Sequence, residues 1–157
     1  TECQKLDSCF IDSNGDMRFV YAKEMSDRSE VEAYVEEHDI RFSLAFGPVM
    51  IDNGRLCEIP DPYRIGEIDT VNDRAALCQM GQLHYMFATV TASKHPRGYQ
   101  NVETFAKCLY DLGCINAYNL DGGQTATMVM NDTLVSYTKE RRISDIIYFA
   151  TAVPDGA

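Results

Sequence analysis

Residues 113–128 have the sequence GCINAYNLDGGQTATM, in which an apolar segment ends abruptly in an acid and two glycines. Adjacent glycines let the main chain take positive φ values and turn successive N–H groups toward one point, where an anion binds. Asp121 would then lie at the rim of this loop. The alternative is a tight turn in which Asp121 bonds only its own backbone. The pattern predicts a strand over residues 114–120 and leaves the role of the loop open.

A helix is predicted immediately before this strand. Apolar residues recur at helical spacing between residues 102 and 112, and Gly113 is suited to the left-handed conformation that ends a helix. A second helix is predicted from about residue 27 to Asp39, because Asp27 and Glu30 have the spacing of a capping box. Asn14-Gly15 between two short apolar runs predicts an N-terminal β-hairpin.

The remaining short apolar runs, separated by turn residues, predict further strands. They cover residues 42–46, 49–51, 75–80, 83–90, 126–130, 134–137 and 143–150. We expect the middle strands to form an antiparallel meander and the last ones to close the sheet. No linker or internal repeat is seen. The sequence therefore predicts one α+β domain over residues 1–157, with a mostly antiparallel sheet and two principal helices.

The composition excludes several classes of function. There are 14 Lys and Arg residues against 24 Asp and Glu, and this net charge of −10 disfavours nucleic-acid binding. No apolar run approaches the roughly 20 residues that span a bilayer, so no transmembrane segment is expected. The chain begins Thr-Glu-Cys, without Met or a signal sequence, which indicates a chain processed or truncated at its start.

The six cysteines show no C-x-x-C spacing, so neither a structural zinc site nor any other metal site is expected. Their even number leaves disulfide bonds open. Cys78 and Cys108 lie within apolar patterns, where a buried free thiol is the commoner state.

The segment NLDGGQTAT at residues 119–127 resembles the Asn-Leu-Asp-Gly-Gly-Gly-Ser-Ala-Thr motif of the phosphodiester glycosidase family. Upstream, residues 45–54 resemble the Gly-Pro strand of that family and its following turn. Residues 74–77 resemble its Arg-Thr-Ala segment, and residues 142–144 its closing Arg-x-Ser strand. The order and spacing agree over roughly residues 43–151.

The resemblance implies a hydrolase that cleaves a sugar-1-phosphodiester at the anomeric carbon, without a cofactor. Asp121 would be the catalytic carboxylate, as base, nucleophile or electrostatic stabiliser. Arg74 would clamp the phosphate, since a guanidinium binds phosphate bidentately, although pairing with Asp69 or Asp73 at a strand edge is the alternative. The implied substrate-binding residues are Gly47, Asn119, Gly122, Gly123, Thr125 and Arg142.

The sequence departs from the family pattern in two places. Gln124 and Thr125 stand where the family usually has Gly and Ser. The Asn-Gly-Gly-Phe-Phe-like segment with which the family domain normally begins does not occur before Thr1. We therefore expect this chain to be the C-terminal portion of the domain. The missing part of the site is then lacking from this chain, supplied by a second chain, or absent in the native protein. A non-catalytic, carbohydrate-binding or exopolysaccharide-binding relative is the alternative, and an extracellular or cell-envelope location is expected.

Overall fold

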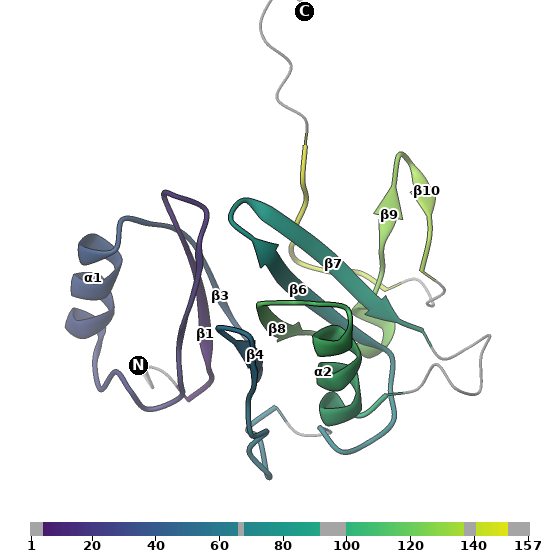
Figure 1. The fold of residues 1–157 in the computed structure, drawn as a ribbon, viewed down its shortest axis with the longest axis horizontal. Coiled ribbons are helices and arrows are strands. Elements are labelled where there is room, and N and C mark those ends of the chain that lie inside the picture. Colours follow the sequence, from purple (N-terminus) through teal and green to yellow (C-terminus); the bar gives the residue numbers. More distant parts are fainter. Residues whose placement is uncertain (1–4, 66–67, 92–99, 137–140, 151–157) are drawn as a thin grey trace, which may run out of the picture.

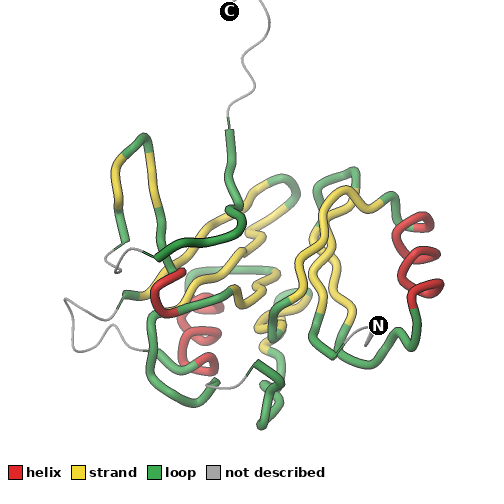
Figure 2. Tube along the Cα trace, turned by 180° about the vertical axis from the view of Figure 1, so that it is seen from behind, coloured by secondary structure: helices red, strands yellow, loops and turns green. Residues whose placement is uncertain are grey.

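The computed structural model describes residues 5–65, 68–91, 100–136 and 141–150. Within these residues the chain forms two α-helices and antiparallel strands (Figure 1). The α+β prediction with two principal helices is confirmed, although the strands are divided between two main sheets and a small hairpin. Seen from behind, each main sheet has its own helix (Figure 2). No helix in the described ranges is long and apolar enough to cross a membrane.

The first sheet contains the N-terminal hairpin. Its order is β2-β1-β3, with β1 at Ser8–Asp12, β2 at Met17–Val20 and β3 at Ile40–Ala45. Gly15 has a φ of +81°, which is the left-handed conformation that the Asn-Gly turn predicts. Helix α1, Arg28–Glu37, covers one face and is capped by the Asp27 side chain, as predicted. Phe10 packs against Tyr34 of this helix, with ring centroids 5.2 Å apart.

The second sheet has five strands in the order β5-β4-β8-β6-β7. The strands are β4 Val49–Asp52, β5 Arg55–Leu56, β6 Arg74–Gly81, β7 His84–Val90 and β8 Asn116–Leu120. The predicted simple meander is wrong, because β8 lies between β4 and β6. Both faces of β8 are buried, with Ala117 in the cluster under helix α2, Val102–Asp111, and Tyr118 in the cluster between the sheets. A strand buried on both faces requires a central position.

Helix α2 begins at the N-cap Asn101 and leads to Gly113, whose φ of +89° agrees with the predicted cap. Its buried face is formed by residues 102, 105, 106 and 109. Cys108 is exposed, which corrects the prediction of a buried thiol, because position 108 falls outside this repeat. Leu112 follows the helix and is also exposed. Cys78 is buried and free, as predicted.

The C-terminal part differs most from the prediction. Among the described residues after β8, the strands are limited to a small hairpin, with β9 at Val129–Met130 and β10 at Thr133–Leu134. Residue 137, the end of the predicted strand 134–137, lies outside the described residues. The predicted strand over residues 143–150 is absent and its side chains are exposed. Apolar, β-prone residues form a strand where a neighbouring strand can hydrogen-bond with their main chain. Here the contact of Phe149 with β7 is made by its side chain, which stacks on Tyr85 and Phe87.

Candidate functional site

The loop after β8 is fastened to the beginning of β6. Leu120 pairs with Ala75, and the amide of Gly123 donates to the main-chain oxygen of Asp73 at 2.9 Å. A Cβ added at Gly122 would overlap this same oxygen, so only glycine fits the close approach. Gly123 has a φ of +59°, which requires conformational freedom rather than space. The two glycines therefore have different functions in holding one turn.

A single turn of 3₁₀ helix, Gly123–Thr125, completes the loop. The Thr125 hydroxyl donates to the Gly122 carbonyl oxygen at 2.7 Å, and the Thr125 amide donates to the same oxygen at 3.2 Å. Ala126 is fully buried and anchors the far end of the turn. In this arrangement Thr125 shapes the loop, because its hydroxyl hydrogen is already engaged within it.

Asp121 extends from this loop into solvent. Its side chain is 52% exposed, and its Oδ2 lies 3.9 Å from Nη1 of Arg141, which is 53% exposed. At this distance and exposure the pair contributes little to stability. Arg142, the predicted substrate-binding residue, is exposed one position further on. The structure thus places Arg141 next to the Asp121 carboxylate. The motif comparison did not single out Arg141.

Arg74 lies at the start of β6, one position before the Ala75–Leu120 pair, so the two strands are neighbours as expected. Its side chain is buried, and among the described residues the guanidinium donates to at least three main-chain carbonyls. Nε bonds the Gln100 oxygen at 2.9 Å, whereas Nη2 bonds the oxygens of Thr70 at 2.5 Å and Ile68 at 3.5 Å. These contacts join the 68–70 loop to the start of α2. These contacts favour a structural role for Arg74, which would hold in place the start of β6 to which the Asp121 loop is bonded.

Asn119 and Gly47 are brought together, as two predicted substrate-binding residues. Asn119 is 1% exposed, and its Nδ2 donates to the Gly47 oxygen at 2.8 Å. Its Oδ1 has no hydrogen-bond partner within the described part of the chain. An unsatisfied buried acceptor calls for a donor such as a water or a hydroxyl group. Gly47 has a φ of +77°, and a Cβ there would overlap the Tyr63 hydroxyl, so its first role is structural.

The buried carboxylate of Asp7 binds main-chain amides near Gly47. Asp7 is 4% exposed, and its two oxygens accept the amides of Ala22 and Val49, each at 2.9 Å. Its own amide donates to the Tyr63 hydroxyl at 2.9 Å, and its carbonyl accepts the Tyr118 hydroxyl at 2.6 Å. The sequence contains no signal for this network, because the partners of Asp7 are between 15 and 111 residues away.

Burial makes the two phenols in this network weaker acids. It raises the pKa of Tyr63 to about 12 and raises that of Tyr118 above its ordinary value. Like an ordinary tyrosine, each is neutral at physiological pH, and each donates a hydrogen bond to a main-chain oxygen. Both phenols bond the main chain of Phe46, the residue before Gly47. No group of three His, Cys, Asp or Glu residues in the described ranges comes together as a metal site requires.

The fold was compared with known structures, and two of the similar ones are described here. The catalytic domain of zebrafish N-acetylglucosamine-1-phosphodiester α-N-acetylglucosaminidase, auto-inhibited by its pro-peptide, has a TM-score of 0.59 at 21% identity, covering 86% of this chain and 45% of that one. A hypothetical protein from Synechocystis has a TM-score of 0.52 at 14% identity, covering 85% and 31%. At these identities the likeness shows the fold, and this chain spans less than half the length of either structure.

No curated protein matches the sequence. The family model of the phosphodiester glycosidases matches residues 4–150, which is nearly the whole chain. This match includes both main sheets, the two helices and the loop that carries Asp121. The chain belongs to the phosphodiester glycosidase family.

Proposed function

We propose that this protein hydrolyses a sugar-1-phosphodiester at the anomeric carbon and that Asp121 is the catalytic carboxylate. The observation that carries the proposal is the placement of Asp121. Its carboxylate is about half exposed, whereas the strand that presents it is buried and the loop around it is held by Gly122 and Gly123. Exposure gives a substrate access, and the fixed loop supplies the orientation that catalysis needs. Family membership supports the same reaction class.

The reaction makes modest demands on acid catalysis. Water adds to the anomeric carbon, the bond from that carbon to the phosphate oxygen breaks, and a free sugar and a phosphomonoester leave. A phosphomonoester is a good leaving group, since its second pKa is about 6. The main requirement is a carboxylate near the anomeric centre that stabilises developing positive charge or accepts the proton of the water. Asp121 meets this requirement in either role.

A cation is also needed to bind the phosphate, and the chain has two candidates. Arg141 lies 3.9 Å from Asp121 and is half exposed, so a phosphate bound beside the carboxylate would reach its guanidinium. Arg74 has its Nε and Nη2 groups engaged by carbonyl oxygens. We propose Arg141 as the residue that contacts the phosphate and Arg74 as the residue that supports the loop. The clamp role for Arg74 stays a prediction.

The first substrate to test carries N-acetylglucosamine, because the zebrafish enzyme is named for its N-acetylglucosamine-1-phosphodiester substrate. Incubation of the full protein with an alkyl phosphodiester of α-linked N-acetylglucosamine-1-phosphate should release free sugar and alkyl phosphate. The matched alkyl N-acetylglucosaminide, which lacks the phosphate, should release much less. Equal rates on both compounds would contradict phosphodiester hydrolysis. Tight binding of the phosphodiester without release of sugar would instead support the carbohydrate-binding alternative.

A further inference from the structure

Two cysteine side chains meet in the hydrophobic cluster under α2. Cys78 of β6 is fully buried, and Cys114, two residues before β8, is 3% exposed. The Cys78 thiol donates a hydrogen bond to the Cys114 sulfur. Two sulfurs in such contact can be joined covalently with little rearrangement of the main chain. The pair is therefore a candidate site for a disulfide bond.

Hydrogen bonds of the main chain hold the residues beside these two cysteines. The amide of Cys114 donates to the Leu109 oxygen of α2 at 3.1 Å, and the amide of Ile115 donates to the Gln79 oxygen of β6 at 2.9 Å. The residue after Cys114 is thus bonded to the residue after Cys78. The contact between the two sulfurs is therefore set by the fold of the main chain.

The other described cysteines have different neighbours. Cys9 lies in the cluster between the two sheets, and Cys108 is exposed on α2. The Cys57 sulfur lies 3.5 Å from the Tyr21 hydroxyl oxygen. The contact between two thiols therefore selects one pairing among the cysteines that the structure describes.

We infer that Cys78 and Cys114 form a disulfide bond when the protein folds under oxidising conditions. The electron acceptor is a small-molecule disulfide such as oxidised glutathione. The thiolate of one cysteine attacks this disulfide, forms a mixed disulfide and releases one glutathione thiolate. The thiolate of the other cysteine then attacks the mixed disulfide and releases the second glutathione. The cysteine pair loses two electrons and two protons, and the two glutathione molecules leave as thiols that carry them.

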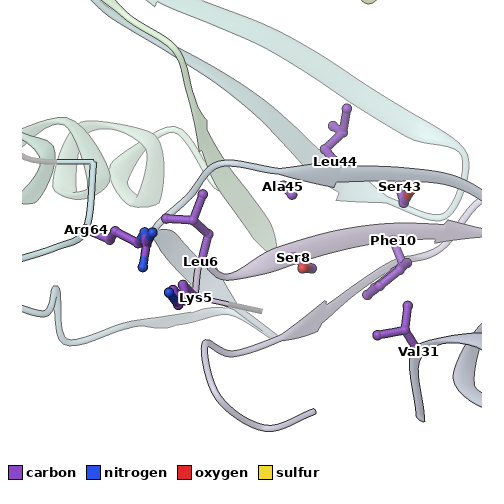
Figure 3. A pocket seen from close by; sticks show the side chains of 9 residues that line it. All are labelled: Lys5, Leu6, Ser8, Phe10, Val31, Ser43, Leu44, Ala45 and Arg64. Carbon is purple, nitrogen blue, oxygen red and sulfur yellow. The ribbon is translucent and has the colours of Figure 1, made fainter. Parts of the chain in front are cut away.

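The exchange takes place while the chain is still folding. Desolvation raises the pKa of both thiols in the folded protein, which keeps them in the thiol form that does not attack disulfides. The groove of about 410 Å³ beside the first sheet (Figure 3) is lined by neither cysteine, so it does not bring a small disulfide to them. Once formed, the buried bond is protected from reducing thiols in the same way.

The bond would join two residues that are 36 positions apart, with β7 and α2 between them. A cross-link of this kind stabilises the fold mainly by restricting the unfolded chain. It would also tie β6 to the residues that lead into β8, the strand before the Asp121 loop. The inference concerns the stability of this pair of strands and is independent of the proposed hydrolysis.

The test is refolding of the full protein from denaturant in two buffers, one with a mixture of reduced and oxidised glutathione and one with dithiothreitol. Peptide mapping of the first product without reduction should find a pair of peptides joined through Cys78 and Cys114. The second product should lack this pair. The oxidised protein should melt at least about 5 °C above the reduced protein.

Cys114→Ala removes one partner of the bond, and Cys108→Ala, which removes an exposed thiol of α2, is the matched control. The quantity compared is the difference in melting temperature between the oxidised and the reduced form of the same variant. The cost of the cavity left by Cys114→Ala is present in both forms and cancels. The difference should vanish in Cys114→Ala and keep its wild-type value in Cys108→Ala.

Free thiols at both positions after oxidative refolding of the wild type would overturn the inference, as would a linked peptide that joins either residue to another cysteine. Equal differences in melting temperature in the two variants would also overturn it, because another bond would then cause the effect. A disulfide that forms without raising the melting temperature would overturn its stabilising role. If Cys114→Ala does not fold, peptide mapping of the wild type decides the pairing.

Discussion

The amide nitrogen of Gly123 donates a hydrogen bond to the main-chain oxygen of Asp73 at 2.9 Å. This contact fastens the loop that carries Asp121 to the residue just before β6. The two bonded residues are 50 positions apart in the sequence. A Cβ at Gly122 would overlap the same oxygen of Asp73. The position of the Asp121 loop is therefore set by contact between two stretches of main chain, which have little freedom to adjust.

Gly122→Ala should displace the loop and reduce hydrolysis by about ten-fold or more, because the new Cβ meets main-chain atoms. Gly123→Ala is the matched comparison. Its Cβ would meet nothing within 4 Å, and the cost arises only from the φ of +59°, about 1–2 kcal/mol. Kinetics and thermal unfolding of both variants test this. Wild-type activity in a folded Gly122→Ala protein would show that the close approach does not position Asp121.

Arg74→Lys should destabilise the fold by about 1–3 kcal/mol, because an ammonium group does not reproduce the separate bonds of Nε and Nη2 to buried carbonyls. Arg141→Gln should change stability by less than about 0.5 kcal/mol, since the residue is half exposed, and should weaken turnover of phosphodiesters. Denaturant unfolding and steady-state kinetics measure the two effects. Unchanged stability with lost phosphodiester turnover in Arg74→Lys would restore the clamp role to Arg74.

Asp7→Asn should lower the free energy of unfolding by about 2–4 kcal/mol. The carboxylate oxygens accept the amides of Ala22 and Val49, and the side-chain NH₂ group of Asn would face one of these donors. Asp52→Asn is a suitable control, since Asp52 is partly exposed and, among the described residues, its carboxylate accepts from the side chains of Tyr21 and Asn53. Urea unfolding of both variants is the measurement, and equal losses would contradict a special role for Asp7.

Features set by near neighbours in the chain could be predicted from the sequence. Asn14-Gly15 specifies its hairpin, Asp27 caps α1, and Gly113 ends α2, since each acts within a few residues. The Asp121 loop was found in the same way, because an acid and two glycines follow directly on a buried strand.

Features set by distant contacts could not be predicted. The position of β8 between β4 and β6 depends on both of its faces being buried, which the strand pattern alone does not reveal. The three carbonyls that engage Arg74 come from loop residues with no recognisable motif. Residues 143–150 have β-prone side chains, but no strand in the described ranges pairs with them through main-chain hydrogen bonds. Sequence periodicity indicates which residues favour a strand, but it does not indicate whether a neighbouring strand is available to pair with them.

The thiols should differ strongly in reactivity. Cys108 is exposed on α2, whereas Cys9 is buried and its pKa is raised to about 12 by desolvation. The thiolate is the form that reacts, and the raised pKa keeps Cys9 almost entirely in the thiol form at pH 8. Iodoacetamide followed by peptide mapping should therefore label Cys108 well before Cys9 and Cys78. Labelling of Cys9 at the rate of Cys108 in the folded protein would contradict the burial of the first sheet.

The most direct test of the account is the turnover of the phosphodiester of N-acetylglucosamine by Asp121→Asn. The amide keeps the shape of the side chain but loses the charge and proton affinity of the carboxylate, so kcat should fall by roughly 10²-fold or more. Stability should be nearly unchanged, because Asp121 is half exposed and its ion pair with Arg141 is long. Asp111→Asn, at an exposed position at the end of α2, is the control and should keep full activity. Full turnover by Asp121→Asn would contradict the assignment of Asp121 as the catalytic carboxylate.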